Sequence, residues 1–364
     1  MGYSGVRGGQ EAIAAAERLV RRDRFGGTSP WLELDQITGR LGLAVDRVMG
    51  EAGLWSAGLA ARAIRQARGD VLEAAQLLRA HRSTLPRLAY SLPVATTVLR
   101  PVRRIAPAHR NPPGGQLLGH TTDYTPRVLD VTDDAPAAAS APAPGAGVPA
   151  DAVHGVRTPD AATAQADRHA GAMPPGLLAD RRDPADPGPY DITRSPARPG
   201  TPRSARLTAL ARAETGSLTH LWYTVTRAPR HDQPEIPIEL RRGRLPLRVA
   251  HPVTGGPVTV AEVRVTEART VRPDPRPRPD GSRFDTGYGL CLGDNEAKAL
   301  AMAGLDLLVH RDGATDRLEQ KVLIALDGPE ASGFLEHLKL PHYVDFRSTV
   351  DRVRAVRAAA EARP

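Results

Sequence analysis

The feature that most constrains the fold is an abrupt change of composition in the middle of the chain. Residues 131–188 are poor in large apolar side chains and begin with an alanine- and proline-rich run at Asp133-Asp-Ala-Pro-Ala-Ala-Ala-Ser. Such a segment buries too little apolar surface to offset the conformational entropy lost on folding. The sequence therefore predicts a disordered-like linker or insertion here, with globular structure on both sides.

The segment before this linker reads as a mainly helical N-terminal domain over 1–130. Apolar residues recur at helical spacing through residues 10–90, and charged residues occupy the intervening faces. Gly69 can end one helix, and Asp70 with Glu73 three positions later resembles a capping box that opens the next. This pattern predicts a helical hairpin over 58–84.

The segment after the linker predicts an α+β domain over 189–347, followed by a helical tail over 348–364. Helices are expected at 203–214 and 296–309, and Gly255-Gly256 is a good hairpin turn. Strands are typically rich in β-branched residues, as are the segments 221–226, 236–240, 245–250 and 258–265, and 288–292 also suggests a strand. The proline-rich run from Val271 to Pro279 is expected to be a loop. The fold class is therefore α+β, with a mainly antiparallel sheet and flanking helices.

Charge and cysteine content narrow the classes of function. The 364 residues hold 49 Lys+Arg and 41 Asp+Glu, a net charge of +8 that suits an anionic substrate. The basic residues are dispersed and no nucleic-acid-binding motif is present, so we expect no nucleic-acid partner. No apolar run approaches the roughly 20 residues that span a bilayer, so no membrane role is expected. Cys291 is the single cysteine, which excludes an intrachain disulfide, fits a cytoplasmic protein and predicts a buried thiol rather than a nucleophile.

A double-glycine loop follows a cluster of arginines in the N-terminal part. Adjacent glycines let the backbone turn sharply and direct N–H groups at an anion, and guanidiniums bind phosphate oxygens in bidentate fashion. The loop lacks the Gly-Lys-Ser/Thr ending of a Walker loop. A plain Pro-Gly turn is the alternative. The candidate phosphate-binding residues are Arg103, Arg104, Gly114, Gly115, Gln116 and Arg127.

Two histidines near the C-terminus form a candidate metal site. His337 and His342 are separated by Pro341, which disfavours one continuous helix, so His337 is expected near a helix end and His342 after a bend. Two imidazoles suit zinc but are too few for a closed site, so a third ligand would come from Asp345, from elsewhere in the chain or from a partner. The alternative is a helix cap and a turn histidine on a packed surface.

The run from His337 to Phe346 also resembles the C-terminal signature of the I subunit family of the carbon–phosphorus lyase complex, PhnI. Further blocks in the family's order support the resemblance, which covers most of 1–130 and 191–347. These blocks are 43–49, 113–119 with 123–125, 191–194, and 283–290 with its Gly287-Tyr-Gly289.

The resemblance implies a function within a complex. With subunits G and H and the ATP-binding subunits K and L, proteins of this family displace adenine from ATP by a methylphosphonate, giving ribose methylphosphonate triphosphate. The isolated subunit is associated with purine nucleosidase activity. The family's paired histidines hold zinc close to the radical-SAM subunit J, and each core contains two copies of the I subunit. These are expectations for this chain.

The chemistry of that reaction suggests which residues would act. Breaking the bond between ribose and adenine builds oxocarbenium character, so a carboxylate beneath the sugar would stabilise the transition state. Asp123 and Asp345 are the candidates. An acid near adenine would assist its departure, and Tyr124 or His120 could serve.

Two other interpretations stay open. The chain could be a non-catalytic zinc-binding scaffold whose partners carry the chemistry. An unrelated zinc hydrolase is disfavoured, because the sequence shows no His-Glu-x-x-His motif.

Overall fold

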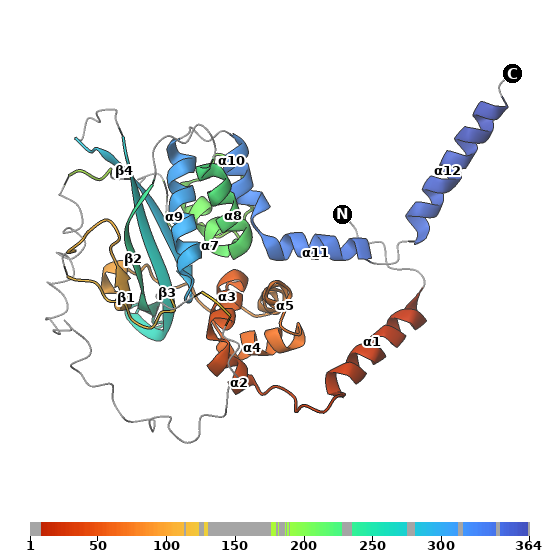
Figure 1. Cartoon of the computed structure of the whole chain (residues 1–364), viewed down its shortest axis with the longest axis horizontal. Helices are drawn as coiled ribbons and strands as arrows, with labels where there is room; N and C mark the ends of the chain where they lie inside the picture. Colours follow the sequence, from red (N-terminus) through yellow and green to blue (C-terminus); the bar gives the residue numbers. More distant parts are fainter. Residues whose placement is uncertain are drawn as a thin grey trace.

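A computed structural model gives the arrangement of the chain (Figure 1). The residues it describes are 9–112, 114–123, 127–129, 176–179, 181, 186, 188, 190–227, 235–274, 281–311, 316–339 and 343–362. Most of the predicted linker, residues 131–175, lies outside the described residues.

The N-terminal part is helical, as predicted. Its helices are α1 (Gln10–Phe25), α2 (Leu34–Arg40), α3 (Gly42–Ala52), α4 (Ala57–Gln66) and α5 (Val71–Ser83). Helices α2 to α5 enclose an apolar core that includes Val48, Met49, Ile64 and Leu78. Helix α1 has no buried residue and lies apart from this bundle (Figure 1).

The helical hairpin predicted over 58–84 is confirmed by α4 and α5. Gly69 adopts a left-handed conformation with φ 93° between the two helices. The Asp70 carboxylate then accepts hydrogen bonds from the backbone N–H groups of Leu72 at 3.0 Å and Glu73 at 3.1 Å. These bonds satisfy N–H groups that the first helical turn leaves free.

A four-stranded sheet forms the second part of the fold. Its strands are β1 (Arg100–Ile105), β2 (Ile236–Ala250), β3 (Pro257–Pro273) and β4 (Phe284–Leu292), in the spatial order β1-β2-β3-β4. Each neighbouring pair is antiparallel, and Gly255 turns the chain between β2 and β3 with φ 71°. The α+β class and the antiparallel sheet are therefore confirmed. Strand β1 comes from within the region 1–130, so the chain before the linker contributes to this sheet.

Two strand predictions were too short. Segments 236–240 and 245–250 belong to the single strand β2, which passes through Gly243 without a break. A Cβ atom at Gly243 would lie 2.2 Å from the Arg100 carbonyl oxygen, so this glycine allows β1 to approach closely at its bulge. Strand β3 continues to Pro273, which corrects the loop expected to start at Val271; residues 275–279 of that loop lie outside the described residues.

The strand predicted at 221–226 is wrong, because these residues form the second half of helix α8 (Thr215–Thr226). Glu214 caps this helix by accepting hydrogen bonds from the backbone N–H groups of Gly216 and Ser217. Trp222 packs against the helix that contains Gly304. A Cβ atom added to Gly304 would lie 2.1 Å from the indole nitrogen of Trp222. Capping and packing here outweigh the β propensity of the aromatic and β-branched residues.

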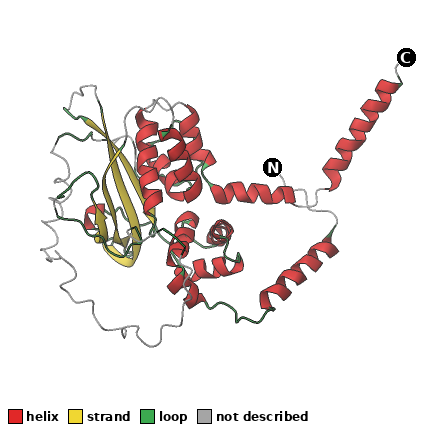
Figure 2. Ribbon diagram, viewed as in Figure 1, coloured by secondary structure: helices red, strands yellow, loops and turns green. Residues whose placement is uncertain are grey.

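The remaining helices cover one face of the sheet and extend from it (Figure 2). They are α7 (Arg203–Arg212), α8, α9 (Glu296–Arg311), α10 (Asp316–Gln320), the π-helical turn η3 (Lys321–Ala325), α11 (Gly328–Lys339) and α12 (Tyr343–Glu361). The helices predicted at 203–214 and 296–309 are confirmed. Helix α9 lies on β4 at Gly287 and Gly289, and its apolar residues, including Met302 and Leu305, form the largest core.

Arg79 links the helical bundle to the second part of the fold. Its guanidinium on α5 donates to the backbone carbonyl oxygens of Glu51, at 2.6 Å, and of Arg212, at 3.3 Å. The same group forms an ion pair with Asp327, just before α11. One side chain thus binds the C-terminal carbonyls of α3 and α7 together, which fixes α3 beside α7.

Some residues at the C-terminal end of the predicted linker contact the sheet. Leu178 forms a parallel bridge with Phe284, and Ala179 N–H donates to the Phe284 carbonyl oxygen at 2.9 Å. Arg181 reaches the buried Asp306 carboxylate on α9 at 3.0 Å. The described residues of 176–181 therefore pack on the globular body.

Cys291 is buried on β4, as the sequence predicts. Burial raises the pKa of its thiol to about 11, so the thiol stays protonated at neutral pH. Of the helices that the structure describes, none combines the length and the apolar character needed to cross a bilayer.

Candidate active-site cleft

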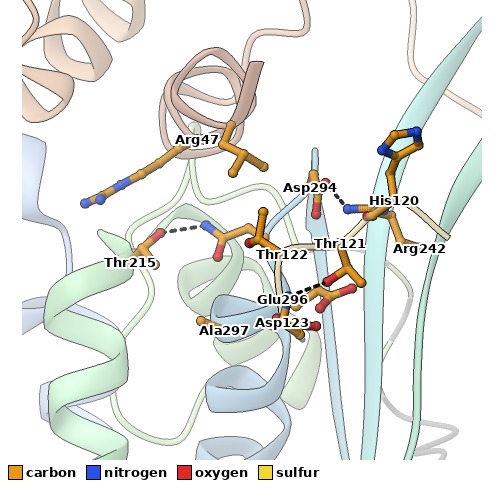
Figure 3. A pocket seen from close by; sticks show the side chains of 12 residues that line it. Arg47, His120, Thr121, Thr122, Asp123, Thr215, Arg242, Asp294, Glu296 and Ala297 are labelled. Atoms are coloured by element: carbon orange, nitrogen blue, oxygen red, sulfur yellow. Dashed lines mark hydrogen bonds and ion pairs between the residues drawn. The ribbon is translucent and has the colours of Figure 1, made fainter. Parts of the chain in front are cut away.

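A cleft of about 580 Å³ lies where the two parts of the fold meet (Figure 3). Its walls come from α3, the N-terminal ends of α8 and α9, strand β2 and the loop 120–123. These elements are far apart in the sequence and are brought together by the packing of α3 against β4 and α7. A volume of this size falls in the range typical of small-molecule sites.

The passage from β4 into α9 shapes one side of the cleft. Gly293 adopts φ 83°, and a Cβ there would lie 2.8 Å from the Asp46 Cβ atom. The Asp46 carboxylate accepts from the Asp294 backbone N–H at 2.9 Å, and the Asn295 side chain accepts from the Lys298 backbone N–H at 3.1 Å. Asp294, Asn295 and Glu296 of this strand–glycine–helix passage line the cleft.

Arg103 holds two carboxylates at the cleft. Its side chain on β1 is only 4% exposed, and its Nε donates to Glu296 at 2.6 Å. The Nη1 atom donates to the Leu118 carbonyl oxygen at 2.6 Å, and Nη2 pairs with Asp123. One buried guanidinium thus fixes the loop 118–123 and places the Asp123 and Glu296 carboxylates next to each other.

Asp123 is the more accessible of these two carboxylates, with 39% of its side chain exposed against 22% for Glu296. Hydrogen bonding with Thr121 lowers the pKa of Asp123, and the positive charges of Arg103 and Arg127 lower it further. The Asp123 carboxylate is therefore negatively charged at neutral pH and faces the cleft together with Thr121 and Glu296 (Figure 3).

A second group of polar residues lines the opposite side, around α3 and α8. Arg47 donates to Glu51 at 2.9 Å and pairs with Glu214. The buried Glu51 carboxylate accepts from the Thr215 hydroxyl at 2.7 Å, and this hydroxyl oxygen in turn accepts from the Asn295 amide nitrogen at 2.8 Å. Helices α3, α8 and α9 are thus joined at the cleft by one chain of hydrogen bonds.

Arg242 on β2 completes the lining. Its guanidinium pairs with the Asp294 carboxylate and donates to the His120 carbonyl oxygen at 2.9 Å. In the part of the lining that the structure describes, the charged side chains are two guanidiniums, Arg47 and Arg242, and three carboxylates, Asp123, Asp294 and Glu296. This described lining therefore carries no excess of positive charge.

The predicted double-glycine loop lies outside this lining. Gly114 and Gly115 both have left-handed conformations, with φ 78° and 74°. Arg104 is 8% exposed, pairs with Glu239 at 2.7 Å and donates to the Gly115 carbonyl oxygen at 2.8 Å. The Gln116 side chain accepts from the Ala106 N–H at 2.8 Å. These contacts attach the loop to strand β1.

The other predicted site residues are only partly described. Arg127 is 79% exposed and lies 3.6 Å from the nearer Asp123 carboxylate oxygen. His337 lies in α11 and Asp345 in α12, with side chains that are outside the described part, and Tyr124 and His342 fall outside the described residues altogether. Helix α11 ends two residues after His337, as expected. The zinc pair stays a prediction, and among the side chains that are described no group of three suits a metal ion.

Among the lining residues that the sequence did not single out are Thr215, Arg242, Asn295 and Glu296. Glu296 and Asn295 follow the Gly293-Asp294 break, which marked the start of a helix and could have drawn attention to them. Thr215 and Arg242 carry no local signal, because Arg242 falls between the two predicted strand segments and Thr215 follows directly after the predicted helix 203–214.

Comparison with known proteins gives consistent matches along the chain. Residues 2–360 match the family described as "Bacterial phosphonate metabolism protein (PhnI)". A putative C-P lyase subunit protein, HtxH, of Stutzerimonas stutzeri is 42% identical over 377 aligned residues, which cover 100% of this chain and 98% of the relative.

Two further relatives carry the name alpha-D-ribose 1-methylphosphonate 5-triphosphate synthase subunit PhnI. The protein of Rhizobium meliloti (strain 1021) is 37% identical, with 99% of this chain and 96% of the relative covered. The protein of Escherichia coli (strain K12) is 38% identical, with 97% of each covered.

Proposed function

Because the chain belongs to the PhnI family of bacterial phosphonate metabolism proteins, we propose that it is a subunit of a carbon–phosphorus lyase system. With partner subunits of the G, H, J, K and L types, it displaces adenine from ATP by methylphosphonate and forms ribose methylphosphonate triphosphate. The printed names of its relatives support the synthase assignment. In the absence of phosphonate, water takes the nucleophile's place and the chain acts as a purine nucleosidase. Two copies of the chain in each complex belong to the same proposal.

The observation that carries the enzymatic part of the proposal is the position of Asp123. Its ionised carboxylate is exposed in the cleft and held in place by the buried Arg103. When adenine departs, positive charge develops at the anomeric carbon, and a fixed carboxylate beneath the sugar stabilises that charge. Arg103 acts as a positioning residue in this scheme, since its donors already bind Asp123, Glu296 and Leu118.

The departing adenine needs a proton or a hydrogen bond. His120 lines the cleft, and an imidazole can act as a general acid or donate a hydrogen bond. Tyr124 follows Asp123 directly and remains the alternative acid. Asp345 remains an alternative carboxylate, contributed from α12.

Zinc binding by His337 and His342 is part of the proposal as well, with a further ligand from a partner. The end of α11 at Lys339, two residues after His337, is compatible with this pairing. When bound, zinc would join this end of the chain to the J-type subunit. Neither the acid–base steps nor the cleft residues described above depend on it.

The proposal is tested by following adenine release from ATP chromatographically, with the chain alone and with its partner subunits, in the presence and absence of methylphosphonate. We expect the chain alone to release adenine and form ribose triphosphate, and the complex with methylphosphonate to form the phosphonate ester. If no adenine appears in either case, the transferase assignment is wrong. Adenine release that persists after disruption of the cleft would favour the scaffold alternative, in which partners carry the chemistry.

A further inference from the structure

We propose that the cleft holds the ribose and adenine of the nucleotide, and that the counter-charge for the triphosphate comes from a divalent cation or a partner subunit rather than from the guanidiniums in the described lining of the cleft. This inference rests on the proposed function and specifies which part of the substrate the chain itself recognises. It differs from the expectation drawn from the sequence, in which the arginines near the double-glycine loop bind phosphates.

The first argument is that the guanidiniums around the cleft are already committed. Arg47 is held by Glu51 and Glu214, and Arg242 by Asp294 and the His120 carbonyl oxygen. The buried Arg103 donates to the carboxylates of Glu296 and Asp123 and to the Leu118 carbonyl oxygen. A triphosphate that recruited these groups would have to displace carboxylates bound at ion-pair distance.

The second argument is that the displaced carboxylates would keep their negative charge. Glu214 caps α8, and hydrogen bonds from the backbone N–H groups of Ser217 and Gly216 outweigh the effect of its burial and lower its pKa. Asp123 is likewise held ionised by its hydrogen bond with Thr121 and by nearby arginines. Phosphate oxygens in this space would meet fixed negative charges, and in a partly desolvated cleft that repulsion is strong.

The third argument is that the same carboxylates match the nucleoside. Ribose hydroxyl groups and the adenine amino group are hydrogen-bond donors, and ionised carboxylates are pure acceptors. Asp123 and Glu296 are both bound to Arg103, and both carboxylates line the cleft, where they can accept hydrogen bonds from sugar hydroxyl groups. Hydrogen bonds from neutral donors to charged acceptors are among the stronger ones in proteins.

The test is a competition measurement on the full chain and on the assembled complex. Binding of fluorescent ATP is measured against adenosine and against tripolyphosphate, with and without Mg²⁺. We expect adenosine to displace the probe, and tripolyphosphate at the same concentration to leave its binding to the isolated chain unchanged. Glu296→Gln is expected to weaken adenosine binding about 10-fold, because it replaces a charged acceptor by a neutral one.

The Arg47→Met variant distinguishes nucleoside binding in the cleft from phosphate binding there. The substitution keeps much of the side-chain volume, and its unfolding midpoint is compared with that of the parent chain to verify folding. The inference predicts that affinities for adenosine and ATP change by the same factor. A selective loss of ATP affinity, or displacement of the probe by tripolyphosphate from the isolated chain, would overturn it. So would failure of adenosine to compete in both preparations.

Failure of the inference can be told apart from failure of the proposed function. Adenine release by the complex is measured in the same samples. If adenine is released while tripolyphosphate, not adenosine, competes at the cleft, the transferase assignment stands and the nucleoside assignment is rejected. If the cleft binds adenosine as expected but no adenine is released, the nucleoside assignment stands and the transferase assignment is rejected.

Discussion

Replacing Asp123 with asparagine is expected to lower the rate of adenine release about 100-fold or more, with little change in stability. The amide keeps the size of the side chain but lacks the negative charge that stabilises the developing oxocarbenium ion. Since the pKa of Asp123 is lowered in the folded protein, the carboxylate stays ionised well below neutral pH. Any fall in the rate of adenine release between pH 7 and pH 5 should therefore result from protonation of a group other than Asp123. The measurement is the initial rate of adenine release by the complex at saturating ATP.

Asp191→Asn provides a matched control for this substitution. Asp191 is also paired with an arginine, Arg87, and hydrogen bonding from Thr193 lowers its pKa to about 2, but it lies outside the cleft. We expect this variant to release adenine at the parental rate. Equal rates of adenine release by the Asp123 variant and the parent chain would show that Asp123 takes no part in the reaction.

Replacing Gly289 with alanine is expected to destabilise the folded chain by about 1–3 kcal/mol. The added Cβ would lie 2.1 Å from the Ala299 carbonyl oxygen and 2.8 Å from the Met302 Cβ atom, both on α9. Backbone atoms cannot yield as a flexible side chain does, so α9 must shift away from β4 and disturb the largest core. The measurement is the midpoint of unfolding in denaturant, compared with the parent chain.

Gly256→Ala is the control for this prediction. Gly256 lies in the turn between β2 and β3, where the nearest atom to an added Cβ is the Thr254 hydroxyl oxygen at 3.6 Å. This substitution should leave the midpoint nearly unchanged. A Gly289 variant as stable as the Gly256 variant would mean that α9 does not pack against β4 as closely as described here.

The elements predicted correctly from sequence are those with strong local signals. Asp70 after Gly69 marks the start of α5 through a cap formed within four residues, and a turn at Gly255 needs only its own left-handed conformation. Helix α8 was missed because its stability depends on a cap at Glu214 and on the fit of Trp222 at Gly304. Such a fit between distant residues is not visible in a window of sequence.

The candidate site could be predicted only in part for the same reason. Asp123 was named as a candidate from the sequence, but the residues that hold it in place were not. Arg103 was expected to face a phosphate, yet it is buried between Asp123 and Glu296, which lie 20 and 193 positions away. The resemblance of Gly287-Tyr-Gly289 to a family block has a structural reason as well, because both glycines make room for α9.

The central claim is that adenine release takes place in this cleft, and selective blocking of the cleft tests it most directly. Cys291 is buried and protonated, so a cysteine placed at the exposed Thr122 can be labelled alone with a bulky maleimide. Val253→Cys, at an 87% exposed position in the β2–β3 turn, is the labelled control. The account predicts that labelling abolishes adenine release in the Thr122 variant and leaves the Val253 variant active. Full activity of the labelled Thr122 variant would contradict it.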